Sequence, residues 1–470
     1  MEFYTNFVGF MNTWLYKPFI VPLFLIVAGL VFTVGTKFIQ FRCLKETFRV
    51  VGEKPSKEGG ISSFGALMVS TASRVGTGNI IGVSTALCTG GPGAIFWLWV
   101  TAILGGASAY VESTLAQIFK RKDTDGSSYG GPSYYMETAL GQRWLGVIFA
   151  IIIILTYAVG YNMLASYNLQ SCFAAFSFYG AKTPMVIGIV LAVLFGIIVF
   201  GGAKRLTKVT GVMVPVMGVF FIAISLLVMV LNAKNLGNMF GMIFADAFNF
   251  KAIFGGFFGS CVMWGIKRGL YSNEAGMGSA PNAAATADVS HPAKQGLVQM
   301  LSVFIDSLLI CTATAFMCLS TGVAPTLEQS GAPYVQAAMA ETLGAIGPIF
   351  IAVSLSLFAF TTLIGNYYYC EGCLRFILKR KPSQGLLTVF RIVASILVLV
   401  GAMLSAGLVW DTADMLQGLM VIINIPVILI LAKPAFAALE DYMAQRKAGK
   451  EPKYNAKVCG IKQDTEFWND

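Results

Sequence analysis

The sequence has few charged residues and only one histidine. Asp, Glu, Lys and Arg make up 12% of its 470 residues, whereas soluble domains carry about 25%. With 56% of the residues hydrophobic, this composition excludes an ordinary soluble domain and predicts an all-α membrane protein. The single histidine, His291, provides no basis for a His-based metal site or a Ser-His triad.

Two other signals are also missing. The one CxxC pair, Cys370 and Cys373, has no second pair beside it, so we expect the nine cysteines to pack as small hydrophobic residues. The N-terminal stretch lacks a basic n-region and a small-residue cleavage site, so we expect no cleaved signal peptide.

Positive charge is in excess, with a net charge of +10, and it clusters in the loops between apolar stretches. These clusters are topology signals and do not indicate nucleic-acid binding. By the positive-inside rule they predict eleven spans, with the N-terminus outside and the C-terminus in the cytoplasm. We expect a multi-pass protein of the cell inner (plasma) membrane, with residues 37–57 forming an amphipathic helix on its cytoplasmic surface.

Residues 63–90 are apolar and long enough to cross a bilayer, but their middle is a poor continuous helix. Gly76 and Gly78 flank Thr77 and precede Asn79, and each glycine inside a helix costs roughly 1 kcal/mol relative to alanine. This predicts a helix broken at mid-membrane, whose free N–H groups favour an anion and whose free carbonyls favour a cation. The alternative is that the glycines only form a close-packing surface between helices.

A related stretch occurs 194 residues later, where 258–280 aligns with 64–86. Two glycine-interrupted apolar segments at corresponding places in two halves are typical of a transporter built from an inverted repeat. The identical pairs are Phe64/Phe258, Gly65/Gly259, Arg74/Arg268, Asn79/Asn273, Gly82/Gly276 and Ala86/Ala280.

The repeat and the spans together predict four regions. Residues 1–60 hold an additional N-terminal transmembrane helix and the amphipathic helix. Residues 61–232 form the first inverted repeat and residues 233–434 the second. Residues 435–470 form a cytoplasmic tail that we expect to be partly disordered.

Three motifs resemble those of the alanine or glycine:cation symporters, the sodium:alanine symporter family, and the resemblance covers nearly the whole chain. It implies a LeuT-type five-plus-five inverted-repeat core with one additional N-terminal transmembrane helix, about 11 spans in all. It also implies a small neutral amino acid as substrate and sodium as the usual coupling ion. The motifs are the break at 75–79, the run Gly90-Gly91-Pro92-Gly93-Ala94-Ile95-Phe96-Trp97-Leu98-Trp99, and residues 268–281.

The first break is the candidate site for the carboxylate of an amino acid. The backbone N–H groups of Gly76, Thr77 and Gly78 begin the outer half-helix, where the partial positive charge lies. The Asn79 side chain supports them, serves as a helix cap, or does both.

Three further residues are candidates for the substrate pocket. The matching region of the family contributes a substrate-contacting glutamine, which implies this role for Gln170; the alternative is a hydrogen bond between helices. Met263 and Trp264, on the second broken segment, are candidate walls of a small pocket. For a Trp in a membrane helix, core packing or interfacial anchoring is the commoner role.

The resemblance also implies a sodium site between the first broken segment and the eighth core helix. Its ligands, matched by motif, are the carbonyls of Ala72, Val75 and Phe358 and the hydroxyls of Thr361 and Thr362. Hard oxygen ligands without a full charge suit a weakly held monovalent ion that leaves in every cycle. The alternative is that the threonine hydroxyls bond back to carbonyls one turn earlier.

Ionisable residues inside or near apolar spans are functional candidates by default. Arg268 and Glu274, which we place near cytoplasmic ends, form either an inner gate by pairing or a purely structural ion pair. Asp306 and Glu112 leave proton coupling open. The full set is Arg74, Glu112, Lys267, Arg268, Glu274 and Asp306.

We therefore predict a secondary active transporter that imports alanine or glycine with sodium by alternating access. The alternatives are a proton-coupled amino-acid symporter and a glutamine-preferring member of the same family. A channel would need no inverted repeat with two broken helices, and no motif supports an intramembrane enzyme. The expected partners are the amino acid, sodium and the bilayer, without a cofactor or nucleic acid.

Overall fold

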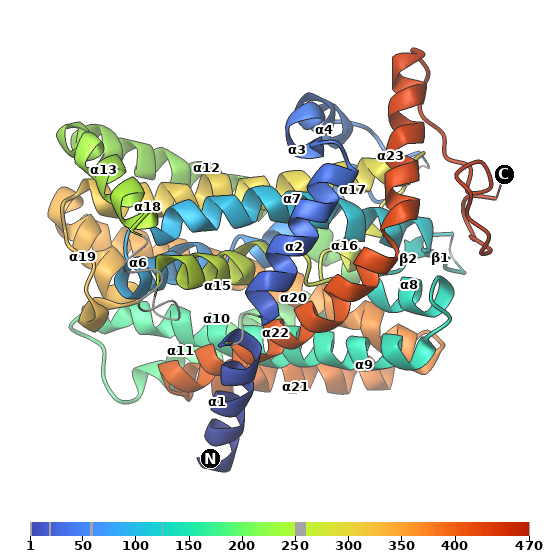
Figure 1. Ribbon diagram of the computed structural model, residues 1–470. Coiled ribbons are helices and arrows are strands. Elements are labelled where there is room, and N and C mark those ends of the chain that lie inside the picture. The colour runs from blue at the N-terminus through green and yellow to red at the C-terminus, as the bar shows by residue number, and fades with distance from the viewer. Residues whose placement is uncertain (1, 18–19, 57–59, 125, 250–259, 470) are drawn as a thin grey trace.

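The computed structural model describes residues 2–17, 20–56, 60–124, 126–249 and 260–469. Helices form nearly all regular structure in this part of the chain (Figure 1). The one sheet found among these residues is a hairpin of β1 (Arg121–Lys122) and β2 (Ser128–Tyr129), with Arg121 opposite Tyr129.

The helices up to residue 232 include two π-helical turns, η1 and η2, in which N–H groups bond to carbonyls five residues back. In order they are α1 (Glu2–Tyr16), α2 (Ile20–Gly35), α3 (Ile39–Arg42), α4 (Leu44–Val51), α5 (Ser63–Arg74), η1 (Gly78–Gly82), α6 (Val83–Gly90), α7 (Ala94–Ile118), α8 (Pro132–Thr138), α9 (Arg143–Ile154), η2 (Leu155–Tyr161), α10 (Asn162–Ser171), η3 (Cys172–Ala175), α11 (Thr183–Val199) and α12 (Gly202–Leu231).

The helices after residue 232 include a third π-helical turn, η6. In order they are η4 (Ala233–Asn235), α13 (Leu236–Ala247), α15 (Cys261–Asn273), α16 (Pro281–Ala284), α17 (Pro292–Val303), η6 (Phe304–Cys311), α18 (Thr312–Ser320), η7 (Leu327–Gln329), α19 (Ala332–Leu343), α20 (Ile346–Leu378), α21 (Gln384–Met403), α22 (Ala406–Ile430) and α23 (Ala432–Lys447).

Eight helical stretches among the described residues are long and apolar enough to cross a membrane, which confirms the predicted all-α, multi-pass architecture. Helix α11 is apolar but shorter, at 17 residues, and the two glycine-interrupted segments are not continuous helices. The count of eleven spans therefore stays a prediction.

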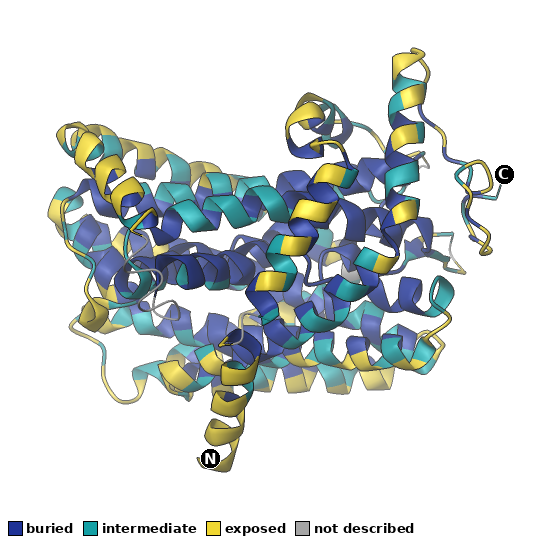
Figure 2. Cartoon of the chain, viewed as in Figure 1, coloured by how far each residue is buried: buried dark blue, intermediate teal, exposed yellow. Residues whose placement is uncertain are grey.

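Burial separates central helices from peripheral ones. The most apolar windows of α20 and α22 are 61% and 67% buried, against 28% for α12 and 33% for α21. The peripheral helices turn large apolar side chains outward, among them Val219 and Val393, as helices facing lipid do. Figure 2 shows the same division, with buried residues concentrated around α15 and α20.

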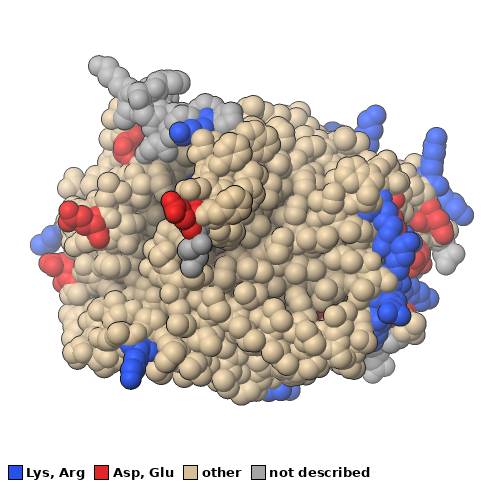
Figure 3. All heavy atoms as spheres, turned by 90° about the horizontal axis from the view of Figure 1, so that it is seen from below, with Lys and Arg blue, Asp and Glu red and all other residues tan. Residues whose placement is uncertain are grey.

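Basic side chains gather at the end of the molecule that carries the hairpin and the C-terminus (Figures 1 and 3). Arg375, near the end of α20, links this helix to the loop of the hairpin. Its guanidinium bonds to both Asp123 carboxylate oxygens at 2.6 and 2.9 Å. These bonds hold the pKa of Asp123 well below its usual range. By the positive-inside rule this basic end faces the cytoplasm, an orientation that stays a prediction.

The predicted amphipathic helix at 37–57 is two short helices, α3 and α4. Lys37 and Phe38 take left-handed backbone conformations before α3 begins. The two helices bury Ile39 and Val50 and expose Phe41 and Phe48. Lys57 lies outside the described residues.

The N-terminal region contains a helix, α1, that was not predicted. It lies against α22, where the Asn12 amide donates to the Asp411 carbonyl at 2.8 Å and the Tyr16 hydroxyl to the Asp414 carbonyl at 2.9 Å. This region therefore contributes two helices, α1 and α2, beside the core.

The prediction that the C-terminal tail is partly disordered is wrong for the described residues. After α23 the chain folds back, and Tyr454 and Trp468 are buried. The Trp468 indole donates to the Gln117 carbonyl at 2.8 Å, and Lys120 lies over the Trp468 ring at 5.0 Å. The tail is rich in charge, but these aromatic side chains bury enough apolar surface to order it.

Candidate functional site

The first apolar segment is broken as predicted. Helix α5 ends at Arg74, and helical structure resumes after a non-helical Val75–Gly76 step. The Asn79 side-chain oxygen accepts the Gly76 N–H at 2.8 Å, so Asn79 caps the second half of the helix. Its amide group also donates to the Asp306 carboxylate at 2.7 Å.

The second broken segment also has an asparagine beside its break, but here the break follows Asn273, whereas in the first segment it precedes Asn79. Helix α15 ends at Asn273, and the next residue, Glu274, takes a left-handed conformation. The Asn273 side-chain oxygen accepts the Ala275 N–H at 3.0 Å, and its amide donates to the Ser307 hydroxyl at 3.2 Å. The predicted start of this segment, residues 251–259, lies outside the described residues.

The two breaks meet on one π-helical turn. Asp306 and Ser307, adjacent in η6, receive hydrogen bonds from the asparagines of the two breaks, and Ser272 of α15 donates to Asp306 at 3.0 Å. A π-turn displaces the helix path by one residue. The π-turn η6 is the element that contacts the asparagines of both breaks.

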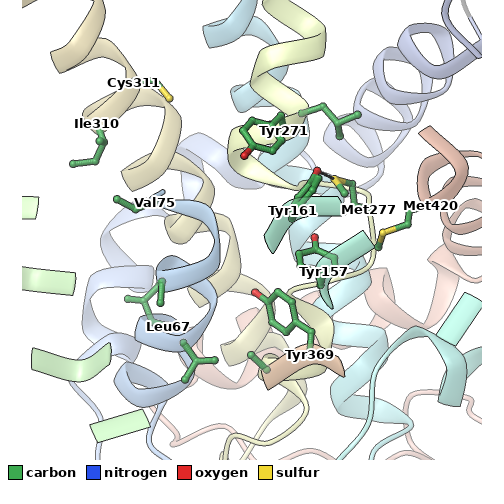
Figure 4. Packing of buried hydrophobic residues seen from close by; sticks show 14 of the residues in the cluster. Leu67, Val75, Tyr157, Tyr161, Tyr271, Met277, Ile310, Cys311, Tyr369 and Met420 are labelled. Atoms are coloured by element: carbon green, nitrogen blue, oxygen red, sulfur yellow. Dashed lines mark hydrogen bonds between the residues drawn. The ribbon is translucent and has the colours of Figure 1, made fainter. Parts of the chain in front are cut away.

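Thr77, inside the first break, contacts two other elements. The Asn168 amide of α10 donates to its hydroxyl at 3.0 Å, and the Tyr271 hydroxyl lies 3.4 Å away. Tyr271 begins a column of rings that continues through Tyr161, Tyr157 and Tyr369 beside the first broken helix (Figure 4), with neighbouring centroids 4.9 to 5.2 Å apart. The break therefore faces hydroxyl and amide groups on one side and an aromatic wall on another.

The other predicted pocket residues lie away from this group. Gln170 is buried and accepts the Tyr179 hydroxyl at 2.7 Å. Trp264 packs against Gly90, where an added Cβ would approach its side chain to 2.6 Å, and Arg268 lies 5.0 Å from its ring. Met263 is buried one residue before Trp264. In this conformation Asn168 and Tyr271, not these three, contact the break.

The predicted sodium ligands lie where α5 packs against α20. The two backbones are in contact, because a Cβ on Gly365 would lie 2.5 Å from the Ser73 nitrogen. The Thr362 hydroxyl is buried and has no hydrogen-bond partner among the described residues. It points at Gly76, where an added Cβ would collide with it. A buried hydroxyl without a partner is costly, and a cation at this junction would satisfy it.

The Thr361 hydroxyl bonds back to carbonyls one turn earlier, the alternative given above for the two threonines. It donates to the carbonyls of Leu357 and Phe358, both at 3.0 Å. A hydroxyl has two acceptor lone pairs besides its one proton, so this bond leaves the oxygen able to contact a cation. Ala72, Val75 and Phe358 are all buried at the same junction.

The predicted gate pair, Arg268 and Glu274, is not formed in this structure. Arg268 instead bonds to both Asp414 carboxylate oxygens, at 3.2 and 3.3 Å, and Lys267 to one of them at 2.7 Å. Glu274 accepts the hydroxyls of Ser73 and Ser279.

The centre of the molecule has an excess of buried acid. Glu112, Glu274 and Asp306 are at most 1% exposed, as is Arg74, the one cation among the described residues that interacts with all three. Uncompensated charge is expensive in a membrane interior. With all three carboxylates ionised this group is short of positive charge, which favours uptake of a cation or a proton.

Sequence reasoning missed Asn168, Ser272 and Tyr271 as residues that contact the breaks. The available signal was a polar residue in an apolar span, which Asn168 shares with its neighbour Gln170. Ser272 and Tyr271 fall inside a motif used for the resemblance, but no pattern in that motif marks their side chains as pointing to the break.

Comparison with known proteins covers nearly the full chain. Residues 1–456 match the family described as the sodium:alanine symporter family. The amino-acid carrier protein AlsT of Bacillus subtilis is 45% identical over 95% of this chain and 94% of its own length. The probable sodium/glutamine symporter GlnT of the same organism is 43% identical over 98% and 96%. The sodium/alanine symporter AgcS of Methanococcus maripaludis is 36% identical over 94% and 98%.

A solved structure shares the fold. MhsT, crystallised in complex with L-phenylalanine, superposes with a TM-score of 0.54 over 83% of this chain and 90% of its own, at 16% identity. This likeness shows the LeuT-type fold alone.

Proposed function

Because the chain belongs to the sodium:alanine symporter family, we propose that it carries a small neutral amino acid, alanine or glycine, into the cell together with sodium. The observation that carries the proposal is the junction of α5 and α20. There the Thr362 hydroxyl, which has no hydrogen-bond partner in the described part of the chain, points at the Val75–Gly76 break, so one ion would hold both the break and the helix beside it.

The substrate carboxylate is proposed to bind at the same break, on the N–H groups of Gly76, Thr77 and Gly78. In this conformation Asn79 occupies the Gly76 N–H. A carboxylate is a stronger acceptor than an amide oxygen, so substrate binding would displace or supplement this bond. Tyr271, whose ring would lie 2.8 Å from a Cβ on Gly78, limits the space for a side chain.

The proton-coupled alternative has its own observation, the buried Asp306 between the two breaks. Its carboxylate accepts three hydrogen bonds, from Asn79, Ser272 and Ser307. Asp306 contacts both breaks, so a proton or cation bound there would act on both.

Uptake into proteoliposomes distinguishes these functions. Radiolabelled alanine should accumulate under an inward sodium gradient, and a proton gradient at equal sodium should add little. Unlabelled glycine and glutamine, added as competitors, rank the substrates. Accumulation driven by the proton gradient alone would contradict sodium coupling, and stronger competition by glutamine would favour the glutamine-preferring alternative.

Thr362→Ala tests the sodium site directly. Removing the unpartnered hydroxyl should raise the sodium concentration for half-maximal uptake by roughly tenfold, equivalent to about 1.4 kcal/mol. The affinity for alanine at saturating sodium should change much less. Ser356→Ala, on the same helix, is the control, because within the described residues the Ser356 hydroxyl bonds back to the Ala352 carbonyl alone. An unchanged sodium dependence in both Thr362→Ala and Thr361→Ala would place the ion elsewhere.

Orientation is proposed from the basic end. Cys459 is partly exposed in the folded tail at that end, whereas the other eight cysteines are buried. A membrane-impermeant thiol reagent should therefore label Cys459 from the cytoplasmic side only. Labelling of intact cells from outside, lost in Cys459→Ser, would reverse the proposed topology.

A further inference from the structure

Glu112, in the last third of α7, is fully buried and accepts hydrogen bonds from the non-helical segment that follows α15. One carboxylate oxygen takes the Gly276 N–H at 3.3 Å. The other takes the Gly278 N–H at 3.1 Å and the Asn424 amide at 3.0 Å. A side chain of α7 thus holds the backbone of the second break.

The second break has the conformation of a backbone anion site. Glu274, Gly276 and Gly278 all have positive φ, at 55°, 83° and 82°. This places a left-handed residue at every second position, and the N–H groups of both glycines point to the same side. Such concave runs of N–H groups bind anions, and here the anion is the Glu112 carboxylate.

The 194-residue offset that relates the two breaks also relates Glu112 to Asp306. Asp306 accepts the side chain of Asn79 from the first break, and Glu112 accepts the backbone that follows Asn273 in the second. Each half of the chain therefore supplies one buried carboxylate to the break of the other half.

The two carboxylates differ in the chemistry of their partners. The hydrogen-bond partners of Glu112 among the described residues are all N–H donors that have no acceptor to offer, so a protonated carboxyl group would lose a bond there. Asp306 instead bonds to the hydroxyls of Ser272 and Ser307, and a hydroxyl can also turn to accept a proton. The partners of Glu112 thus suit only the anionic form of its carboxyl group, whereas the hydroxyl partners of Asp306 suit either form.

We infer that Glu112 is a positioning residue: an internal anion that fills the backbone anion site of the second break and fixes its left-handed turns. It holds the residues after Tyr271 and Ser272 and so sets how those two side chains face the first break. Filling this site with a side chain leaves the first break as the one for the substrate. The inference does not depend on which ion or amino acid is carried.

The test is anion binding by the purified full-length protein in detergent. Glu112→Ala removes the internal anion and should open the site to formate, a small carboxylate. Titration with sodium formate against sodium chloride, at constant sodium, should raise the melting temperature of Glu112→Ala saturably, by about 2 °C or more. The wild-type protein and Glu112→Gln, whose amide fills the space, should not respond. A response that is equal in all three proteins, or absent from Glu112→Ala, would overturn the inference.

Uptake by conservative variants gives an independent measurement if Glu112→Ala does not fold. Glu112→Asp keeps the charge and Glu112→Gln keeps the length, but the glutamine NH2 group would face N–H donors. Glu112→Asp should retain at least roughly tenfold more alanine uptake than Glu112→Gln, a difference of about one hydrogen bond to a charged group. Ser113→Ala, on the same helix, is the control, because that buried hydroxyl has no partner among the described residues. Equal uptake by Glu112→Asp and Glu112→Gln contradicts the role of the charge.

Discussion

Gly76→Ala is expected to lower sodium-driven uptake by roughly 100-fold. The added methyl group would collide with the Thr362 hydroxyl, and α5 cannot simply move aside, because its backbone already touches α20 at Gly365. Overpacking a tight site costs about 1–3 kcal/mol, and the upper end of that range corresponds to roughly 100-fold. The protein can relieve the collision only by separating α5 from α20 or by rotating the hydroxyl of Thr362, and either response dismantles the proposed sodium site.

The control for this prediction is Gly211→Ala on the peripheral helix α12, where an added Cβ meets nothing within 4 Å. Alanine is favoured over glycine inside a helix by about 1 kcal/mol, so this variant should transport normally and melt no lower than the wild type. The double variant Gly76→Ala/Thr362→Ala separates packing from ion binding. Without the opposing hydroxyl it should recover thermal stability but not sodium dependence. Normal sodium dependence in Gly76→Ala would show that the ion does not bind at this junction.

The breaks themselves could be predicted because their signal is local. Glycine and asparagine in the middle of an apolar segment disfavour a continuous helix whatever surrounds them. The 194-residue repeat of Arg74 and Asn79 as Arg268 and Asn273 added a second copy of that signal, and both segments are interrupted, although the second break follows Asn273 whereas the first precedes Asn79.

The side chains that meet the breaks could not be predicted in the same way. Gln170 and Asn168 are two residues apart in one span, and the choice between them depends on which face of α10 points inward. The π-turn η2 precedes α10, and a π-turn advances the helix by an extra residue and so rotates every later side chain. Regular 3.6-residue periodicity cannot anticipate this shift.

The C-terminal tail was wrongly predicted to be partly disordered for a related reason. Its order depends on long-range contacts of Tyr454 and Trp468 and not on its high local charge.

The partner of Arg268, Asp414, is also a long-range feature. Removing its carboxylate should have a large effect on stability and transport. Asp414 is 1% exposed and accepts from Arg268 and Lys267 together. Arg268 also lies between two aromatic rings, 4.1 Å from Trp410 and 5.0 Å from Trp264. Asp414→Ala would leave both cations without their anion in the interior of the protein. Breaking a buried pair in this way costs about 3–5 kcal/mol, so we expect a large fall in melting temperature and little transport.

A matched set of variants separates loss of stability from loss of a gate. Arg268→Gln/Asp414→Asn removes both charges of the pair and keeps polar groups of similar size, so it should be more stable than Asp414→Ala, since no arginine is left buried alone. The pair has a second role if it also closes a path for ions and substrate between α15 and α22. In that case this double variant should bind alanine but lose tight coupling of alanine transport to sodium. It should also leak sodium when no substrate is present. Glu440→Gln is the control, because the Lys37–Glu440 pair is 66% exposed on both sides and such surface pairs contribute at most about 1 kcal/mol. A double variant that is stable and transports with normal coupling would show that the pair only supports the structure. In that case the path would be closed by the packing of Trp410 and Trp264, with or without the charge between them.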